Sequence, residues 1–113
     1  MKKVFAVLCL SAVILFAACA KKNTAAKTKI TNYTTDVFPL IQMKCTPCHL
    51  PSKGGNKASF EDYASAKEHA AEMVERIELD PGQRGFMPFK HDKLTADEIA
   101  VFKKWVEGGT AEK

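Results

Sequence analysis

Apolar residues recur at helical spacing in three parts of the chain, residues 32–44, 59–79 and 95–107. The second part is expected to start at Ser59 as its N-cap and to break near residues 67–70, which would divide it into two shorter helices. No stretch in or between these parts alternates apolar and polar residues as a half-buried strand does. The sequence therefore predicts helices and no strand. The apolar positions of the three stripes are Val37, Phe38, Leu40 and Ile41, then Phe60, Tyr63, Ala66, Ala70, Met73, Val74 and Ile77, and finally Ile99, Phe102, Trp105 and Val106.

The ends of two predicted helices carry capping signals. Thr95 opens the last helix and Glu98 follows three residues later, which is the pattern of a capping box. A pair of glycines at residues 108–109 is expected to end the same helix. In the first helix Pro39 is tolerated only within the first turn, so the N-cap must lie shortly before it. The candidate N-caps are Thr34, Thr35 and Asp36.

Residues 80–93 interrupt the helical pattern. Met87 stands there between Phe86 and Pro88, so the centre of this segment is apolar. The ring of Pro88 stiffens the chain just after Met87 and removes one N–H group that would otherwise need a partner. We expect a loop that packs its apolar centre on the rest of the domain. The residues that oppose regular structure in it are Pro81, Gly82, Gly85 and Pro88.

The start of the chain has the pattern of an export signal. Lys2 and Lys3 precede an apolar run with a single serine, residues 4–16, and small residues follow. The run is too short for a membrane span and leads into a cleavage-type site. The sequence therefore predicts that the protein acts outside the cytoplasm.

Residues 16–19, Phe-Ala-Ala-Cys, resemble a bacterial lipoprotein box. The resemblance implies that residues 1–18 are removed and that Cys19 carries lipid, which would anchor the chain to a membrane. The other interpretation is an ordinary signal peptide cleaved at a neighbouring alanine. The following polar segment contains four lysines and no acid, and we expect residues 19–31 to act as a flexible basic tether.

The net charge of +4 for the whole chain comes from its start. Residues 32–113 contain 11 basic and 13 acidic side chains, a formal charge of −2. The basic pI is therefore no argument for nucleic-acid binding. A domain of this size has little core and usually needs a metal, a disulfide or a cofactor to stabilise it.

Two cysteines remain in this domain, Cys45 and Cys48, and His49 follows directly. A zinc site needs four ligands, so His69 or His91 would have to complete it, and no second Cys-x-x-Cys is present. A thioredoxin-like redox pair needs a strand before the motif, and none is predicted. A plain disulfide would close a very small loop and leave the histidine unexplained.

Covalent haem accounts for all three residues, because Cys-x-x-Cys-His is the attachment signal of c-type haem. Both thiols would bind the porphyrin and His49 would ligate the iron. Haem is attached outside the cytoplasm, which agrees with the export signal. We therefore expect one haem c, held through Cys45 and Cys48.

The sixth iron ligand has four candidates: Met73, Met87, His69 and His91. Met73 lies on the apolar stripe of its helix, so core packing is the simpler interpretation. His69 neighbours a charged residue and is expected at the surface. Met87 in its apolar loop is the expected ligand, and His91 in the same loop is the second candidate.

With these residues, the segment 34–109 resembles a class I monohaem cytochrome c of the small bacterial type. The resemblance rests on residues 45–49, on the Met87-Pro88 pair and on residues 98–109. It implies an all-α cytochrome c fold of three to four short helices around one haem, with Cys45 and Cys48 as thioether anchors. It also implies His49 as the proximal and Met87 as the distal ligand.

The family's first helix often carries a Gly-aromatic pair, where this chain has Val37 and Phe38. The resemblance places the first and last helices across each other, with Phe38 against Trp105 or its neighbours. Because the haem replaces missing core, we expect the apo chain to be poorly folded.

The expected function is one-electron transfer between redox proteins, such as a donor and an oxidase or reductase, without enzymatic activity. No acid–base or nucleophile set is apparent in the sequence. An open or labile sixth position would favour a gas sensor or a peroxidase-like protein instead. A structural lipoprotein with a zinc or disulfide clip is the third hypothesis. The lysines that could surround an exposed haem edge are Lys53, Lys57, Lys90 and Lys93.

Overall fold

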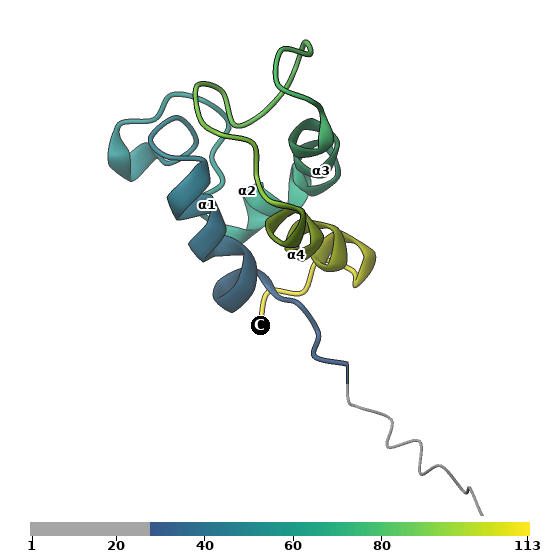
Figure 1. The fold of residues 1–113 in the computed structure, drawn as a ribbon. Helices are drawn as coiled ribbons and strands as arrows, with labels where there is room; N and C mark the ends of the chain where they lie inside the picture. Colours follow the sequence, from purple (N-terminus) through teal and green to yellow (C-terminus); the bar gives the residue numbers. More distant parts are fainter. Residues whose placement is uncertain (1–27) are drawn as a thin grey trace, which may run out of the picture.

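The computed structural model describes residues 28–113 (Figure 1). The predictions for the signal peptide, for Cys19 and for most of the tether lie outside these residues. Within the described residues all regular elements are helical, and the only bridge joins Asn32 to Ala111. The expected all-α class is confirmed at this level. The elements are the π-helix η1 (Tyr33–Val37), α1 (Phe38–Lys44), the 3₁₀ turn η2 (Pro51–Lys53), α2 (Tyr63–Glu68), α3 (Ala70–Glu78) and α4 (Ala96–Glu107).

The first predicted helix is divided into η1 and α1, and its N-cap differs from the prediction. Asn32 caps it, because its side-chain oxygen accepts the N–H of Thr35 at 2.9 Å. Pro39 stands in the first turn of α1, which continues directly from η1. The N-cap of the whole helical segment therefore does not lie shortly before Pro39, and the choice among Thr34, Thr35 and Asp36 was wrong.

The second predicted helix begins later than expected and is interrupted as expected. Asp62, and not Ser59, is the N-cap of α2, since its carboxylate accepts the N–H of Ser65 at 2.9 Å. The break falls at His69, between α2 and α3. Helix α3 then buries the side chains of Ala70, Met73 and Ile77 in the core.

Helix α4 has the predicted ends. The Thr95 hydroxyl accepts the N–H of Glu98 at 3.2 Å, and the Glu98 carboxylate accepts the N–H of Thr95 at 2.8 Å. Gly108 caps the other end. Gly109 has a φ of +86°, a conformation that glycine adopts without steric cost.

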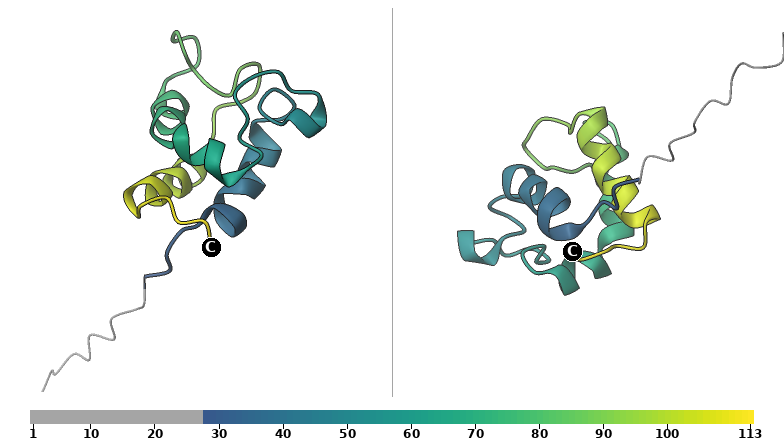
Figure 2. Two further views of the ribbon diagram at one scale, coloured as in Figure 1. Left: turned by 180° about the vertical axis from the view of Figure 1, so that it is seen from behind. Right: turned by 90° about the horizontal axis from the view of Figure 1, so that it is seen from below.

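The two ends of the described chain meet at one end of the molecule (Figures 1 and 2). The N–H of Tyr33 donates to the carbonyl of Ala111 at 2.8 Å, and the indole N–H of Trp105 donates to the same carbonyl at 2.9 Å. Tyr33 is the aromatic neighbour of Trp105, with ring centroids 5.9 Å apart. Phe38, expected against Trp105 or its neighbours, lies beside Tyr33, with ring centroids 5.4 Å apart.

The core lies between the helices and includes segments far apart in sequence. Its largest fully buried side chains are Trp105, Phe102, Ile41, Leu50 and Val37. Residues 80–93 form no helix or strand, as predicted, and lie at the end of the molecule opposite the termini (Figure 1). No helix of residues 28–113 has the length and apolar character needed to cross a membrane.

Candidate functional site

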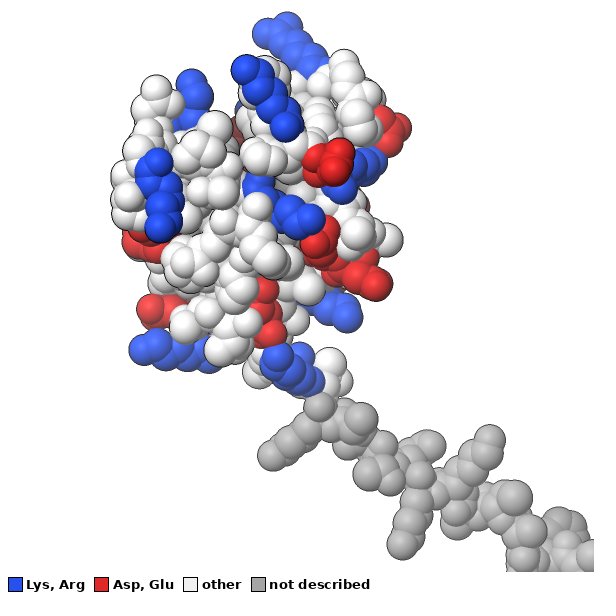
Figure 3. Space-filling model, turned by 60° about the vertical axis from the view of Figure 1, so that its left-hand side comes forward, with Lys and Arg blue, Asp and Glu red and all other residues white. Residues whose placement is uncertain are grey.

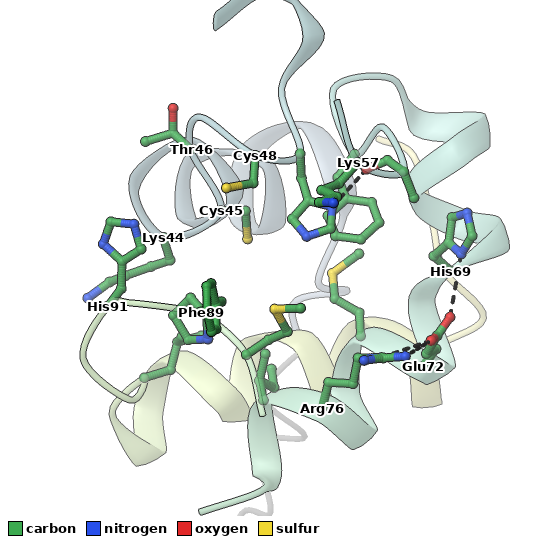
Figure 4. A pocket seen from close by; sticks show the side chains of 18 of the residues that line it. Lys44, Cys45, Thr46, Cys48, Lys57, His69, Glu72, Arg76, Phe89 and His91 are labelled. Carbon is green, nitrogen blue, oxygen red and sulfur yellow. Dashed lines mark hydrogen bonds and ion pairs between the residues drawn. The ribbon is translucent and has the colours of Figure 1, made fainter. Parts of the chain in front are cut away.

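A cavity of about 340 Å³ lies between the segment after α1, helix α3 and the loop of residues 80–93. Its volume falls within the range of roughly 300–1,000 Å³ typical of small-molecule and cofactor pockets. In Figure 4 Cys45 and Cys48 lie on one side, Arg76 and Glu72 on the opposite side, and Phe89 and His91 at a third edge. The residues that form most of its apolar wall are Phe60, Met73, Ile77, Met87, Pro88, Phe89, Leu94 and Phe102.

His49 is fixed in this cavity with one ring nitrogen available. Its Nδ1 lies 2.8 Å from the carbonyl oxygen of Ala58. A carbonyl can only accept, so Nδ1 carries the hydrogen and Nε2 of the neutral ring keeps its lone pair. The ring also stacks on Phe60, with centroids 4.1 Å apart and planes 4° from parallel. Metal-bound histidines usually have such a hydrogen bond from their second nitrogen, which fixes the orientation of the ring.

The segment that contains the cysteines is closely packed against the residues that follow it. The N–H of Lys57 donates to the carbonyl of Cys48 at 3.0 Å, and the N–H of Phe60 donates to the carbonyl of His49 at 2.9 Å. Gly55 lies so close that a Cβ there would be 2.2 Å from the carbonyl oxygen of Pro47 and 2.5 Å from that of Cys48. Only glycine fits at this position without movement of the backbone.

Cys45 and Cys48 are free thiols in this structure. Cys45 is partly buried, and burial raises the pKa of its thiol to about 12. It is therefore protonated at neutral pH. Among residues 28–113 no three His, Cys, Asp or Glu side chains are grouped as a metal site.

The structure brings all four candidates for the sixth ligand to the cavity. Met87 is partly buried and packs against the core, whereas His91 is exposed at the edge. Met73 is 5% exposed, so its core assignment is confirmed, but it also lines the cavity as a second thioether. His69 was expected at the surface, yet it is only partly exposed and lies 5.8 Å from the ring of Phe60.

The sequence contained a signal that places His69 and Met73 together. Residues four apart share one face of a helix, and His69 stands directly at the start of the helix that carries Met73. Arg76, three residues after Met73, lines the same cavity and was not considered from the sequence. Its carboxylate partner Glu72 lies 2.6 Å away and is itself 3.7 Å from Nδ1 of His69.

The lysines expected around the site have different surroundings. Lys57 lines the cavity, and Lys90 lies 5.3 Å above the ring centroid of Phe89. Lys93 forms an ion pair with Asp80 at 2.8 Å, and Lys53 is exposed on η2. Figure 3 shows basic side chains at both the upper and the lower end of this face, with acidic side chains among them mainly in the middle and lower part.

Comparisons of the chain with family models, with curated proteins and with solved structures give no match.

Proposed function

We propose that the protein is a c-type cytochrome that carries single electrons between redox proteins outside the cytoplasm. The observation that carries this proposal is the composition of one apolar cavity. It is lined by Cys45, Cys48, an oriented His49 and the thioether of Met87. No alternative uses all four residues.

The residues present fit a covalently bound haem. Cys45 and Cys48 are free thiols, and thioether formation at a haem vinyl group needs such thiols. Nε2 of His49 retains a lone pair, as an iron ligand requires. The walls are largely apolar, which suits the porphyrin and keeps water from the iron. In this proposal the helices wrap around one haem as in a small cytochrome c.

When bound, the haem iron supplies a one-electron change between its ferric and ferrous states. The protein contributes the surroundings. The hydrogen bond from His49 to Ala58 fixes the proximal ring. A thioether ligand from Met87 raises the reduction potential relative to a histidine ligand. If His49 and Met87 both bound the iron, no position would be left for a substrate, so electron transfer without enzymatic turnover is the expected activity.

The identity of the distal ligand is tested by the visible spectrum of the ferric holoprotein. A far-red charge-transfer band is expected in the wild type and should disappear in Met87→Ala. Met73→Leu serves as the matched control, because it removes the second thioether of the cavity while retaining its volume. Loss of the band in Met73→Leu but not in Met87→Ala would transfer the role to Met73. Absence of the band from the wild type as well as from the variants would indicate His91 as the distal ligand.

A second function is favoured by one observation: Met87 lies in a loop without regular structure and is only partly buried. Displacement of this ligand would open the iron to a diatomic gas or to peroxide. The ferrous holoprotein of an electron carrier should bind carbon monoxide slowly. Rapid binding by the wild type would instead support a gas sensor or a peroxidase-like protein.

The proposal includes attachment to a membrane through Cys19 as a lipoprotein on the periplasmic side. The described chain begins at the end of the molecule opposite the loop of residues 80–93, so an anchor on that side would lie far from this loop (Figure 1). Cys19→Ala should move the protein from the membrane fraction to the soluble fraction. Retention in the membrane fraction after this substitution would contradict lipid attachment.

The haem is also expected to be needed for folding, because the cavity it would fill adjoins the core residues Met73, Ile77 and Phe102. A domain of this size has a small core, and a haem in this apolar cavity would enlarge it. Circular dichroism of the apo chain with both thiols blocked should show much less helix than the holoprotein. Equal helix content in the two forms would contradict this expectation.

A further inference from the structure

Arg76 makes two different connections from α3 to the loop that carries Met87. Its backbone carbonyl accepts the N–H of Met87 at 3.2 Å. Its guanidinium Nη1 donates to the carbonyl of Gly85 at 3.5 Å. One further hydrogen bond joins the described loop of residues 80–93 to α3, from Nζ of Lys93 to the carbonyl of Glu78 at 3.3 Å. The other hydrogen bonds of residues 81–92 are internal turns, such as that from Phe86 to Gln83.

The guanidinium of Arg76 is itself held in place. Its Nε donates to the Glu72 carboxylate at 2.8 Å, and its Nη2 lies 2.6 Å from the same oxygen. Gly85 has a φ of +94°, and a Cβ on it would be 3.6 Å from Nη1 of Arg76. The guanidinium therefore packs directly on the backbone of Gly85, two residues before Met87. Figure 4 shows Arg76 and Glu72 on the cavity wall opposite the cysteines.

We propose that Arg76 is a positioning residue whose side chain keeps the Met87 loop closed against the cavity. The proposal rests on the proposed function, in which Met87 is the distal iron ligand. The bonds of Arg76 lie at Gly85 and Met87, whereas Lys93 bonds to α3 at the far end of the loop. Loss of the guanidinium bond would therefore loosen the part of the loop that carries Met87. The side chain of Arg76 thus controls how often the Met87 sulfur leaves the site and how readily another ligand enters.

An ordinary surface role for Arg76 makes a different prediction. An exposed ion pair between residues four apart on a helix contributes little to helix stability. In that case replacing Arg76 would change helix α3 slightly and leave the loop as it is. Replacing Arg76 therefore changes the motion of the Met87 loop if Arg76 is a positioning residue, and leaves that motion unchanged if it only forms an ion pair on α3.

The test uses the holoprotein with Arg76→Met and Arg76→Lys. Arg84→Met is the matched control, because Arg84 lies in the same loop and has no hydrogen bond or ion pair to another described side chain or backbone group. Two rates are measured: carbon monoxide binding to the ferrous protein and hydrogen exchange of the Met87 amide. Arg76→Met should accelerate both by roughly three- to tenfold. Arg76→Lys should fall between Arg76→Met and the wild type, and Arg84→Met should match the wild type.

Unchanged rates in Arg76→Met would overturn the proposal. So would an acceleration that appears equally at amides throughout α4, because the effect would then be global unfolding. Failure of the Met87 ligand assignment is recognised separately, by a wild-type ferric spectrum without the far-red band, and failure of the proposed function by a wild-type chain without covalent haem. In that case the exchange rate of the Met87 amide still decides whether Arg76 holds the loop.

Discussion

Gly55→Ala is expected to damage the haem-attachment segment specifically. The added methyl group would lie 2.2 Å from the carbonyl oxygen of Pro47, 2.5 Å from that of Cys48 and 2.8 Å from the Cys48 carbonyl carbon. These are backbone atoms, which cannot rotate away as a side chain can. A Cβ essentially never approaches another atom within 3.0 Å, so the Pro47 oxygen must shift by at least 0.8 Å, from 2.2 to 3.0 Å.

This shift has an energetic cost with two parts. Overpacking of a closely packed site costs about 1–3 kcal/mol. The movement also weakens the hydrogen bonds from Gly55 to Leu50 at 3.1 Å and from Lys57 to Cys48 at 3.0 Å, each contributing about 1 kcal/mol. We therefore expect Gly55→Ala to lower the free energy of unfolding by about 2–4 kcal/mol.

The assay is denaturant unfolding of the holoprotein together with the fraction of chains that carry covalent haem. Gly54→Ala is the control, since its Cβ would meet no atom within 4 Å although its φ is +84°. Left-handed backbone should cost the control about 1–2 kcal/mol without moving Cys48. Gly55→Ala should reduce haem attachment and the control should not. Equal attachment and equal stability in the two variants would refute the reasoning from close contact.

Three further predictions concern the frame around the cavity. Tyr33→Phe removes the buried hydrogen bond from its hydroxyl to the carbonyl of Phe60 at 2.8 Å, which should lower the free energy of unfolding by about 1–2 kcal/mol in a denaturant titration. Burial, helped by the nearby acids, raises the pKa of Tyr33 from 10.0 to about 12, so the wild type should lose stability as the pH rises from about 10 towards 12, and Tyr33→Phe should lack this part of the loss. Thr95→Ala should lower the free energy of unfolding by about 1 kcal/mol, because the N–H of Glu98 loses the Thr95 hydroxyl as its acceptor. A thermal midpoint of Thr95→Ala equal to that of Thr95→Ser would contradict this.

The direction of the pH effect follows from which state holds the proton. The folded state keeps the Tyr33 proton above pH 10, where the unfolded chain releases it. The stability that protonated Tyr33 contributes is therefore fully present below the pKa of tyrosine in the unfolded chain. It is lost as the pH rises through the pKa of Tyr33 in the folded protein. Unfolding free energies of both proteins near pH 9 and near pH 11, roughly, are sufficient for the comparison. A parallel decrease in both would show that another group is responsible.

Local sequence signals predicted the parts of the fold that depend on neighbouring residues. The capping box at Thr95 and Glu98 is set by two residues three positions apart, and it is present as expected. The break near residues 67–70 and the irregular loop of residues 80–93 also follow from local composition. The Cys-x-x-Cys-His segment and Met87 were predicted to belong to one site, and they line one cavity.

The parts that were missed depend on contacts between distant segments. Asn32 caps the first helix where the chain pairs with Ala111, which no local pattern indicates. For the same reason Tyr33 takes the place beside Trp105 that was expected for Phe38. Arg76 resembled an ordinary charged position on a helix surface. Its hydrogen bond to Gly85 depends on the packing of the loop against α3, which no local pattern indicates.

The mass of the intact protein tests the central claim most directly. The chain is expressed with a haem-attachment system, denatured and analysed beside the double variant Cys45→Ser, Cys48→Ser. We predict that the wild type carries the added mass of one haem, has no alkylatable thiol at either position and keeps its colour after denaturation. The double variant should show no added haem mass. A wild-type chain of unmodified mass, with both thiols open to alkylation, would contradict covalent haem binding and the electron-carrier function with it.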